Sequence, residues 1–281
     1  MGAHRLLLLI LGLSPGCADS AARPPPLPCP DGSSCIGTNP TTIGGGTVQA
    51  PDGGTPTGGS LARYNLAGSV VVLNQVPPTG TVTRTGVTGW TIRAVDDLSA
   101  TAMTGADGTF TLTGVLPTLA DAGVPVIGVR AVPTSRASFG AYRELRAGGG
   151  SVTLETFGSE RVLESVAGQG GAPSADLGHV VVQIAEAADP GVGVSSAVVS
   201  ASTASTTFYD SDLIPGQLTP SIAGTGRRGF ALVLNVPAGD DTNGSTVTLR
   251  FQVPGATPVP EAMTVRVFPN TLSWVTVRVA R

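Results

Sequence analysis

A pattern of short apolar segments bounded by glycine occurs twice along this chain of 281 residues. Each copy opens with a valine run, continues with a segment of small residues and ends with a segment that carries Phe after Gly. The segments are residues 68–73, 89–95 and 107–112 in the first copy and 178–184, 194–200 and 229–239 in the second. Apolar runs of this length between glycines are typical of strands. The duplication therefore predicts an all-β chain with two similar modules.

The composition agrees with short strands joined by many turns and excludes several classes of function. The chain has 39 Gly and 23 Pro, and all 16 of its basic residues are Arg. A phosphate-loop lysine, a Schiff base and a Ser-Lys dyad each require an amine that this chain lacks. The net charge of −3 provides no positive field for a phosphate backbone, so we expect no nucleic-acid partner.

The first 17 residues are predicted to form an export signal. Arg5 precedes an apolar run at residues 6–13, which is too short to cross a bilayer but suits a signal-peptide core. The sequence Leu13-Ser14-Pro15-Gly16-Cys17 then resembles the lipobox of bacterial lipoproteins, although Ser14 stands where the motif has an aliphatic residue. The resemblance implies lipidation at Cys17 and a membrane-anchored protein of the cell envelope. The alternative is an ordinary signal peptide that is cleaved nearby.

Residues 18–60 are predicted to be a disordered tether, because they are rich in Pro, Gly, Ser and Thr and hold few large apolar residues. Within this segment Cys29 and Cys35 flank a turn-forming run, which favours a small disulfide loop in an oxidising compartment. Two free thiols or a metal site are the alternatives. If the pair is oxidised, Cys17 remains as the odd cysteine, as an acylated residue would.

The remaining chain is predicted to contain two domains and a connector. The first domain covers residues 61–158, with strands expected at 68–75, 90–95, 109–113, 126–132 and 151–156. Residues 159–177 form the connector, in which the apolar spacing over 159–167 predicts a helix. The second domain covers residues 178–281, and its last strands are expected at 246–253, 263–268 and 273–279.

One family resemblance follows from the first copy of the repeat. The residues that carry it are Gly68, Val70, Gly89, Trp90, Ile92, Ala94, Thr104, Asp107, Gly108, Phe110, Val126 or Val129, and Ala131. This course is similar to the carboxypeptidase regulatory-like module, a transthyretin-type β-sandwich, and covers residues 66–134. The second copy departs from it, because Gly226-Arg-Arg-Gly229 replaces the Asp-Gly turn. The resemblance implies two tandem transthyretin-like sandwiches that assist spacing or association rather than chemistry.

A candidate calcium site lies between two late strands. Asp240, Asp241 and Asn243 place three oxygen donors in one turn, and hard cations prefer such ligands. Asn243-Gly244 is also a favoured hairpin turn that the two aspartates would solvate without a metal. We expect no other cofactor.

Trp274 is the candidate ligand-binding residue, because it alternates with Thr276 and Arg278 and should point away from the valine face of its strand. A hairpin near Asn270 would place Arg266 opposite Trp274 as a cation–π partner. The alternative is that Trp274 packs against the helix or the first domain. His179 opens a valine-rich strand and is interpreted as structural, since no nucleophile elbow accompanies it.

These observations predict a non-catalytic, exported envelope protein that acts in binding, adhesion or scaffolding. Its expected partners are the membrane, through the lipid, and an envelope protein or polysaccharide. One alternative is a polysaccharide-binding module that uses Trp274. The other is a hydrolase with paired carboxylates, although no pair stands out in the sequence.

Overall fold

The computed structural model describes residues 62–77, 82–119, 124–148, 151–213, 216–221, 223–256 and 262–281. Within these ranges the chain consists of strands and one short helix. The predicted signal peptide and tether, with Cys17, Cys29 and Cys35, lie outside the described residues. Their lipidation and disulfide pairing therefore stay predictions.

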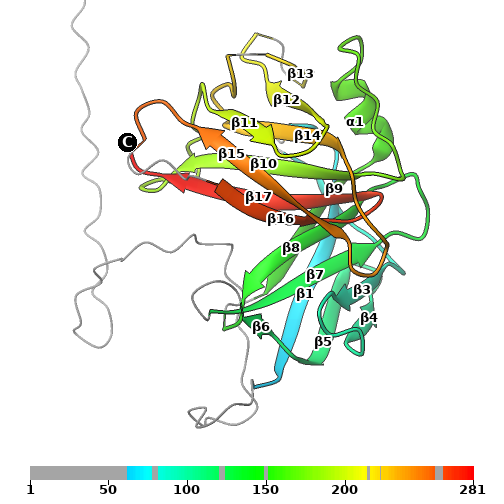
Figure 1. The fold of residues 1–281 in the computed structure, drawn as a ribbon. Helices are drawn as coiled ribbons and strands as arrows, with labels where there is room; N and C mark the ends of the chain where they lie inside the picture. Colours follow the sequence, from blue (N-terminus) through cyan, green and yellow to red (C-terminus); the bar gives the residue numbers. More distant parts are fainter. Residues whose placement is uncertain are drawn as a thin grey trace, which may run out of the picture. The chain divides into compact units, whose positions relative to one another are not determined.

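The first sandwich packs two sheets face to face (Figure 1). In one sheet β1 is the central strand, with β5 and β2 along one edge and β9 parallel to it along the other. The second sheet has the order β4-β3-β7-β8, and β6 pairs with the start of β7. The strands are β1 (Tyr64–Leu73), β2 (Arg84–Gly86), β3 (Thr91–Ala94), β4 (Thr101–Met103), β5 (Thr109–Val115), β6 (Thr118–Leu119), β7 (Pro125–Val132), β8 (Gly140–Arg146) and β9 (Val152–Phe157).

The second sandwich repeats this plan. Its larger sheet has the order β13-β12-β14-β10-β17, and its smaller sheet has the order β11-β15-β16. The parallel pair β10 and β17 corresponds to the parallel pair β1 and β9 of the first sandwich. The strands are β10 (Gly178–Glu186), β11 (Val198–Ala201), β12 (Thr206–Asp210), β13 (Leu218–Thr219), β14 (Phe230–Val236), β15 (Ser245–Gln252), β16 (Ala262–Val267) and β17 (Thr271–Val279).

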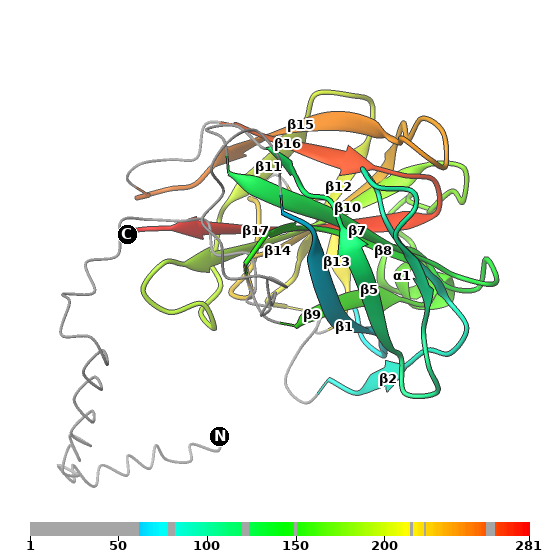
Figure 2. The same cartoon turned by 90° about the horizontal axis from the view of Figure 1, so that it is seen from below.

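The two sandwiches share one continuous sheet. β17 pairs in parallel with β8 at three positions, which joins β13-β12-β14-β10-β17 to β8-β7-β3-β4. Seen from below in Figure 2, β15 and β16 lie on one side of β10 and β17, and β1 and β5 lie on the other. The predicted division between residues 158 and 178 stays a prediction, and strand pairing runs across it.

Three large apolar cores follow from this arrangement, beside a small cluster of Val95, Tyr142 and Phe268. One core fills the first sandwich and includes Leu66, Ile92 and Phe110, and another fills the second sandwich and includes Val182, Val233 and Leu249. The third, which we call the junction core, draws on both sandwiches and on the helix. It contains Val71, Leu73, Val76, Phe139, Phe157, Val162, Val166, Val181, Phe208, Leu218, Phe230, Leu232, Leu234 and Leu272.

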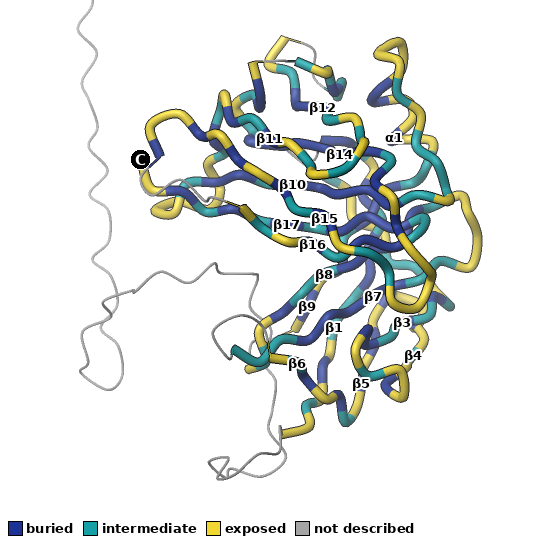
Figure 3. Tube along the Cα trace, viewed as in Figure 1, coloured by how far each residue is buried: buried dark blue, intermediate teal, exposed yellow. Residues whose placement is uncertain are grey.

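The junction core explains the uninterrupted valine run of β10. Successive side chains of a strand point to opposite faces of its sheet. Val180 and Val182 belong to the core of the second sandwich, whereas Val181 between them belongs to the junction core. Both faces of β10 are therefore covered, and Figure 3 shows β10 and β14 buried over most of their length.

Turns that share a set of hydrogen bonds precede β5 and β14. The hydroxyl of Thr104 accepts a hydrogen bond from the backbone N–H of Trp90, and the hydroxyl of Thr225 accepts one from Ala197, each at 3.0 Å. The turn then closes from Gly108 N–H to the Gly105 carbonyl and from Gly229 N–H to the Gly226 carbonyl, again at 3.0 Å in both copies. The sequence Gly226-Arg-Arg-Gly229 thus closes the same hydrogen bond as the Asp-Gly turn, again with a positive-φ glycine at its end.

The hydrogen bonds of this turn show which residues of the two copies correspond, and they differ from the correspondence that the valine runs predict. The Gly108 carbonyl accepts a hydrogen bond from Val70 N–H, and the Gly229 carbonyl accepts one from Ile184 N–H, so Val70 corresponds to Ile184. The sequence comparison had matched Gly68 with Gly178, which is four residues out of register. A run of valines fits several registers equally well, whereas a turn with one positive-φ glycine fits only one.

The helix is shorter than predicted. α1 spans Ser159–Ser165 and not residues 159–167. Its cap residue Val166 has left the helical region, with φ −107° and ψ 7°. Of the predicted apolar stripe, Val162 and Val166 project into the junction core, whereas Leu163 is exposed.

Candidate functional site

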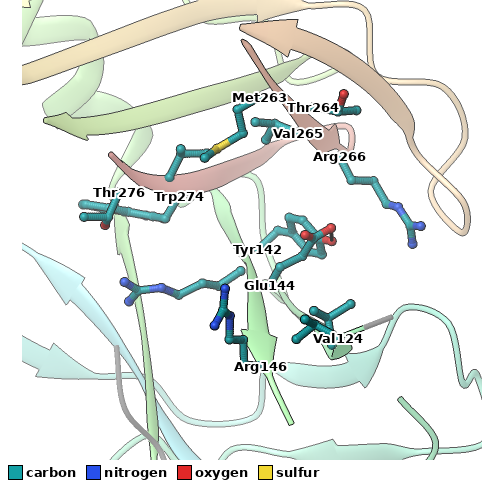
Figure 4. Close-up of a pocket in the computed structure, with 13 residues that line it drawn as sticks. Val124, Tyr142, Glu144, Arg146, Met263, Thr264, Val265, Arg266, Trp274 and Thr276 are labelled. Atoms are coloured by element: carbon teal, nitrogen blue, oxygen red, sulfur yellow. Dashed lines mark hydrogen bonds between the residues drawn. The ribbon is translucent and has the colours of Figure 1, made fainter. Parts of the chain in front are cut away.

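A pocket of about 330 Å³ lies where strands of the two sandwiches meet. The first sandwich contributes β7 and β8, and the second contributes β16 and β17 (Figure 4). The lining residues are Val124, Val126, Tyr142, Arg143, Glu144, Arg146, Met263, Thr264, Val265, Arg266, Trp274, Val275 and Thr276. The volume and the mixture of apolar walls with a few charged groups are typical of a ligand site.

Both predicted ligand-binding residues line this pocket. Trp274 packs against the junction core, and its ring centroid lies 5.8 Å from that of Phe157. The neighbouring residues Val275 and Val277 belong to the core of the second sandwich, so Trp274 does face away from the valines. Trp274 also packs against the first domain, as the alternative interpretation expected, because Phe157 belongs to the first sandwich. The indole Nε1 is buried and has no hydrogen-bond partner in the described part of the chain.

The expected cation–π contact between Arg266 and Trp274 is wrong. Arg266 Nη1 instead donates a 2.6 Å hydrogen bond to a carboxylate oxygen of Asp96, in the first sandwich. Figure 4 shows Arg266 and Trp274 on opposite sides of the pocket. β16 pairs with β15, whereas β17 pairs with β10 and β8. The two strands therefore do not form a hairpin ladder, and Arg266 and Trp274 are not cross-strand neighbours.

Two more ionisable groups of the pocket, Tyr142 and Glu144, are hydrogen-bonded to each other. The Tyr142 hydroxyl donates a 2.9 Å hydrogen bond to Glu144 Oε1. Burial, together with the Glu144 charge, raises the pKa of Tyr142 well above its usual value, so the phenol stays protonated. Arg143 and Arg146 thus remain as the pocket cations with no ion pair among the described residues.

The carboxylate oxygens of the candidate calcium loop accept hydrogen bonds and form ion pairs with other groups of the protein. The Asp240 carboxylate accepts hydrogen bonds from the backbone N–H groups of Thr242 and Asn243 and from the Asn243 amide. Asp241 turns to Arg130, with a 2.7 Å ion pair, and to Arg93 at 3.7 Å. No cluster of three or more His, Cys, Asp or Glu side chains in the described ranges could hold a metal ion. The partners of Asp240 and Asp241 are those that the hairpin interpretation expects, and a calcium ion at this turn stays a prediction.

Arg130 is the largest fully buried side chain in the described part of the chain, and it was not among the predicted site residues. From β7 its guanidinium donates hydrogen bonds to Thr271 Oγ1, to the Asp241 backbone carbonyl and carboxylate, and to the Pro269 carbonyl. The same group lies 4.6 Å from the ring centroid of Phe268. Arg130 thus connects the first sandwich to two loops of the second. The only sequence signal is an Arg within an otherwise apolar strand.

His179 is buried, as its interpretation as a structural residue requires. Its Nδ1 accepts a 3.1 Å hydrogen bond from Asn235 N–H, and its ring meets Phe139 edge-on at 4.8 Å. Burial lowers the pKa of His179 to about 4, because the imidazolium would lose its hydration. The imidazole is therefore neutral in the folded protein at pH 7.

We expect His179 to make the protein less stable in mild acid. Between its unfolded pKa near 6.5 and its folded pKa near 4, the unfolded chain binds a proton that the folded chain does not. Stability therefore falls as pH is lowered through this window, by about 3 kcal/mol in total. The raised pKa of Asp210, caused chiefly by burial, acts in the opposite direction just above pH 3.8.

The measurement is urea unfolding at half-unit steps from pH 7 to 4, for the wild type and His179→Asn. An asparagine can accept the hydrogen bond from Asn235 N–H but does not titrate, and it retains the Asp210 contribution. The variant should lose less stability than the wild type across this range. Parallel pH profiles for the two proteins would show that His179 does not cause the loss.

Comparisons with known proteins add little to this geometry. No family model and no curated protein matches the chain. Solved structures that resemble it include the shaft pilin SpaA of Lactobacillus rhamnosus GG, at 11% identity and a TM-score of 0.25 over 78% of this chain and 99% of that one. The minor pilin GBS52 of Streptococcus agalactiae has 10% identity and a TM-score of 0.24, over 77% and 95%.

A third similar structure is the Bacillus anthracis TIE protein, at 10% identity and a TM-score of 0.24. The match covers 77% of this chain but only 34% of that protein, so this chain spans about a third of its length. With such low TM-scores, any functional argument has to come from the geometry of the chain itself. No helix in the described ranges is long and apolar enough to cross a membrane.

Proposed function

We propose that this chain is a non-catalytic, exported protein of the bacterial cell envelope, lipid-anchored at Cys17, that acts as a binding or scaffolding module. Its two sandwiches are proposed to be transthyretin-like modules related to the carboxypeptidase regulatory-like family. The charged start, the short apolar run and the odd cysteine support the anchor. The fixed connection of the sandwiches supports a scaffold rather than a mobile pair of domains.

The observation that carries the binding role is the pocket between β7, β8, β16 and β17. Neither sandwich alone supplies all of its walls, so the site depends on the shared sheet. Its ionisable groups are Arg143 and Arg146 without ion pairs to described residues, Arg266 paired with Asp96, and the hydrogen-bonded Tyr142 and Glu144. This set provides no matched acid and base for a hydrolase.

A second candidate function is polysaccharide binding, favoured by the position of Trp274 in the pocket wall. Sugar rings stack on open aromatic faces, and the Trp274 indole has an Nε1 donor without a partner in the described chain. Polysaccharide binding would use the same pocket as binding of an envelope protein, and only the class of ligand differs.

The anchor is tested by fractionation of cells that express the full chain. We expect the wild type in the membrane fraction, with an intact mass that shows lipid on an N-terminal Cys17. Cys17→Ser should release the protein or block its maturation, and Cys29→Ser provides the matched control. A mature N-terminus away from Cys17 without lipid would contradict the anchor.

The binding role is tested in cells with a photo-cross-linking amino acid at Thr276, in the pocket, or at Thr111, an exposed position on β5. We expect an envelope adduct from position 276 and none from position 111. Adducts that protease digests indicate a protein partner, and adducts that it spares indicate the polysaccharide. Equal labelling from both positions would contradict a specific site.

A further inference from the structure

The pocket lies at the point where β8 and β17 separate. These strands pair only through Thr271 with Gly140, Leu272 with Ala141 and Ser273 with Tyr142. β8 then continues to Arg146 and β17 to Val279, each still paired with its neighbour on the far side, β7 or β10. From these pairings, the two strands form a wedge that opens away from Ser273.

The edges of the wedge carry unpaired backbone groups. In a sheet, alternate residues direct their N–H and C=O groups to one neighbouring strand and the rest to the other. Residues 143–146 and 274–279 therefore point about half of these groups into the wedge, where the described chain supplies no partner strand. β16, which also borders the pocket, pairs only with β15.

The lining residues show that the pocket is this wedge and not a hollow on one face of the sheet. On β8, Arg143 follows the face of Leu145, which belongs to the core of the first sandwich, whereas Glu144 and Arg146 lie on the opposite face. On β17, Trp274 and Val275 likewise lie on opposite faces. A cavity bordered by both faces of two strands lies between those strands.

We propose that the wedge between β8 and β17 binds an extended acidic peptide of a partner protein, which adds as a strand to the shared sheet. This inference rests on the proposed binding function and specifies its ligand. Strand addition satisfies open backbone groups with main-chain hydrogen bonds, and the side chains of the added strand alternate between the two faces. An added strand would therefore meet Arg143 on one face and Arg146 on the other.

Charge favours acidic residues on that peptide. Arg146 is exposed and makes no ion pair with any described residue, and Arg143 donates only a long 3.5 Å hydrogen bond to the Thr153 carbonyl. Burial lowers the pKa of Arg143, and the charge of Glu155 offsets this only in part, so a further anion beside Arg143 would stabilise its charge. Since Glu144 already accepts from Tyr142, the cations of the wedge are the groups left to attract a ligand.

The apolar walls favour a peptide with branched side chains between its acidic residues. Met263, Val265 and Val275 border the wedge, and the buried Trp274 Nε1 can donate to a peptide carbonyl. A polysaccharide fits less well, because it offers no regular ladder of donors and acceptors for the open edges. The Trp274 ring is also already packed against Phe157.

The test uses the full chain and the synthetic peptide Ac-VEVTEV-NH2, whose two glutamates are three residues apart and so face opposite sides, like Arg143 and Arg146. Titration calorimetry should give binding that weakens about tenfold with lysine in place of both glutamates. Methyl groups on alternate backbone nitrogens should also cost about tenfold, because they remove the ladder donors. Hydrogen exchange should slow at residues 143–146 and 274–279 when the parent peptide is bound.

Arg143→Gln and Arg146→Gln should each weaken the parent peptide several-fold, and Arg250→Gln on β15, an exposed cation outside the pocket, should leave binding unchanged. Equal affinity of the methylated peptide would overturn strand addition. So would binding of oligogalacturonate, an acidic saccharide, with no binding of the peptide. If cells still yield a position-276 adduct while the peptide does not bind, the peptide assignment is wrong and the binding function stands.

Discussion

Arg130→Met is expected to lower the free energy of unfolding by about 4 kcal/mol. Methionine can occupy the space of the arginine stem, so the loss comes from the guanidinium rather than from a cavity. Without it, Thr271 Oγ1 and the Asp241 carbonyl lose the arginine donor, and the Pro269 carbonyl keeps only its hydrogen bond from Thr271 Oγ1. Because Arg130 is only 2% exposed, little water is available to replace it.

Arg136→Met is the matched control for this experiment. Arg136 pairs with Asp176 at 3.6 Å, but both side chains are more than three-quarters exposed. Exposed pairs of this kind contribute little, so we expect a change of less than about 0.5 kcal/mol. Urea unfolding followed by circular dichroism measures both variants. If Arg130→Met unfolds at the wild-type urea midpoint, the guanidinium does not stabilise the connection between the sandwiches.

Gly229→Ala is expected to cost about 4 kcal/mol or to prevent folding. Gly229 has φ +63°, a region that side chains disfavour, and an added Cβ would collide with the Ile184 carbonyl oxygen and lie 2.6 Å from Val194 N. All these contacts are with backbone that is held in the second sandwich. Gly108→Ala should behave in the same way, since its Cβ would collide with the Val70 carbonyl.

The control is Gly255→Ala, where φ is +74° but no described atom beyond the adjacent residues lies within 4 Å of the added Cβ. This variant isolates the backbone cost, about 1–2 kcal/mol. Thermal and urea unfolding of the three variants should therefore place Gly229→Ala and Gly108→Ala well below Gly255→Ala. Similar losses for all three would show that the turn tolerates a side chain and does not determine the register of the repeat.

The strands that alternation and turn residues indicate were predicted well. The strands expected at 109–113, 126–132 and 246–253 appear as β5, β7 and β15 with bounds shifted by one or two residues. β8 was missed, because Tyr-Arg-Glu-Leu-Arg lacks the valines and the clean alternation of its neighbours. The all-β fold could thus be read from local patterns, while the strand that joins the two sandwiches could not.

The candidate site was predicted in part for a similar reason. Trp274 was identified from the alternation of its own strand, which is a local property. The role of Arg130 depends on loops that lie 111 and 139 residues further along the chain, and no local pattern reports such a distance. Phe230 was matched to Phe110, yet it follows its glycine one position sooner and so enters the junction core instead of a sandwich core.

The parallel pairing of β17 with β8 also has a consequence for biosynthesis. Thr271 is made 131 residues after its partner Gly140, so the ribosome completes the first sandwich long before the strand that covers its edge. During that interval β8 presents an open edge, and Leu73 and Phe157 lack their partners from the second half of the chain. The nascent first sandwich is thus an aggregation-prone intermediate. A chaperone that shields strand edges would act on it during this interval.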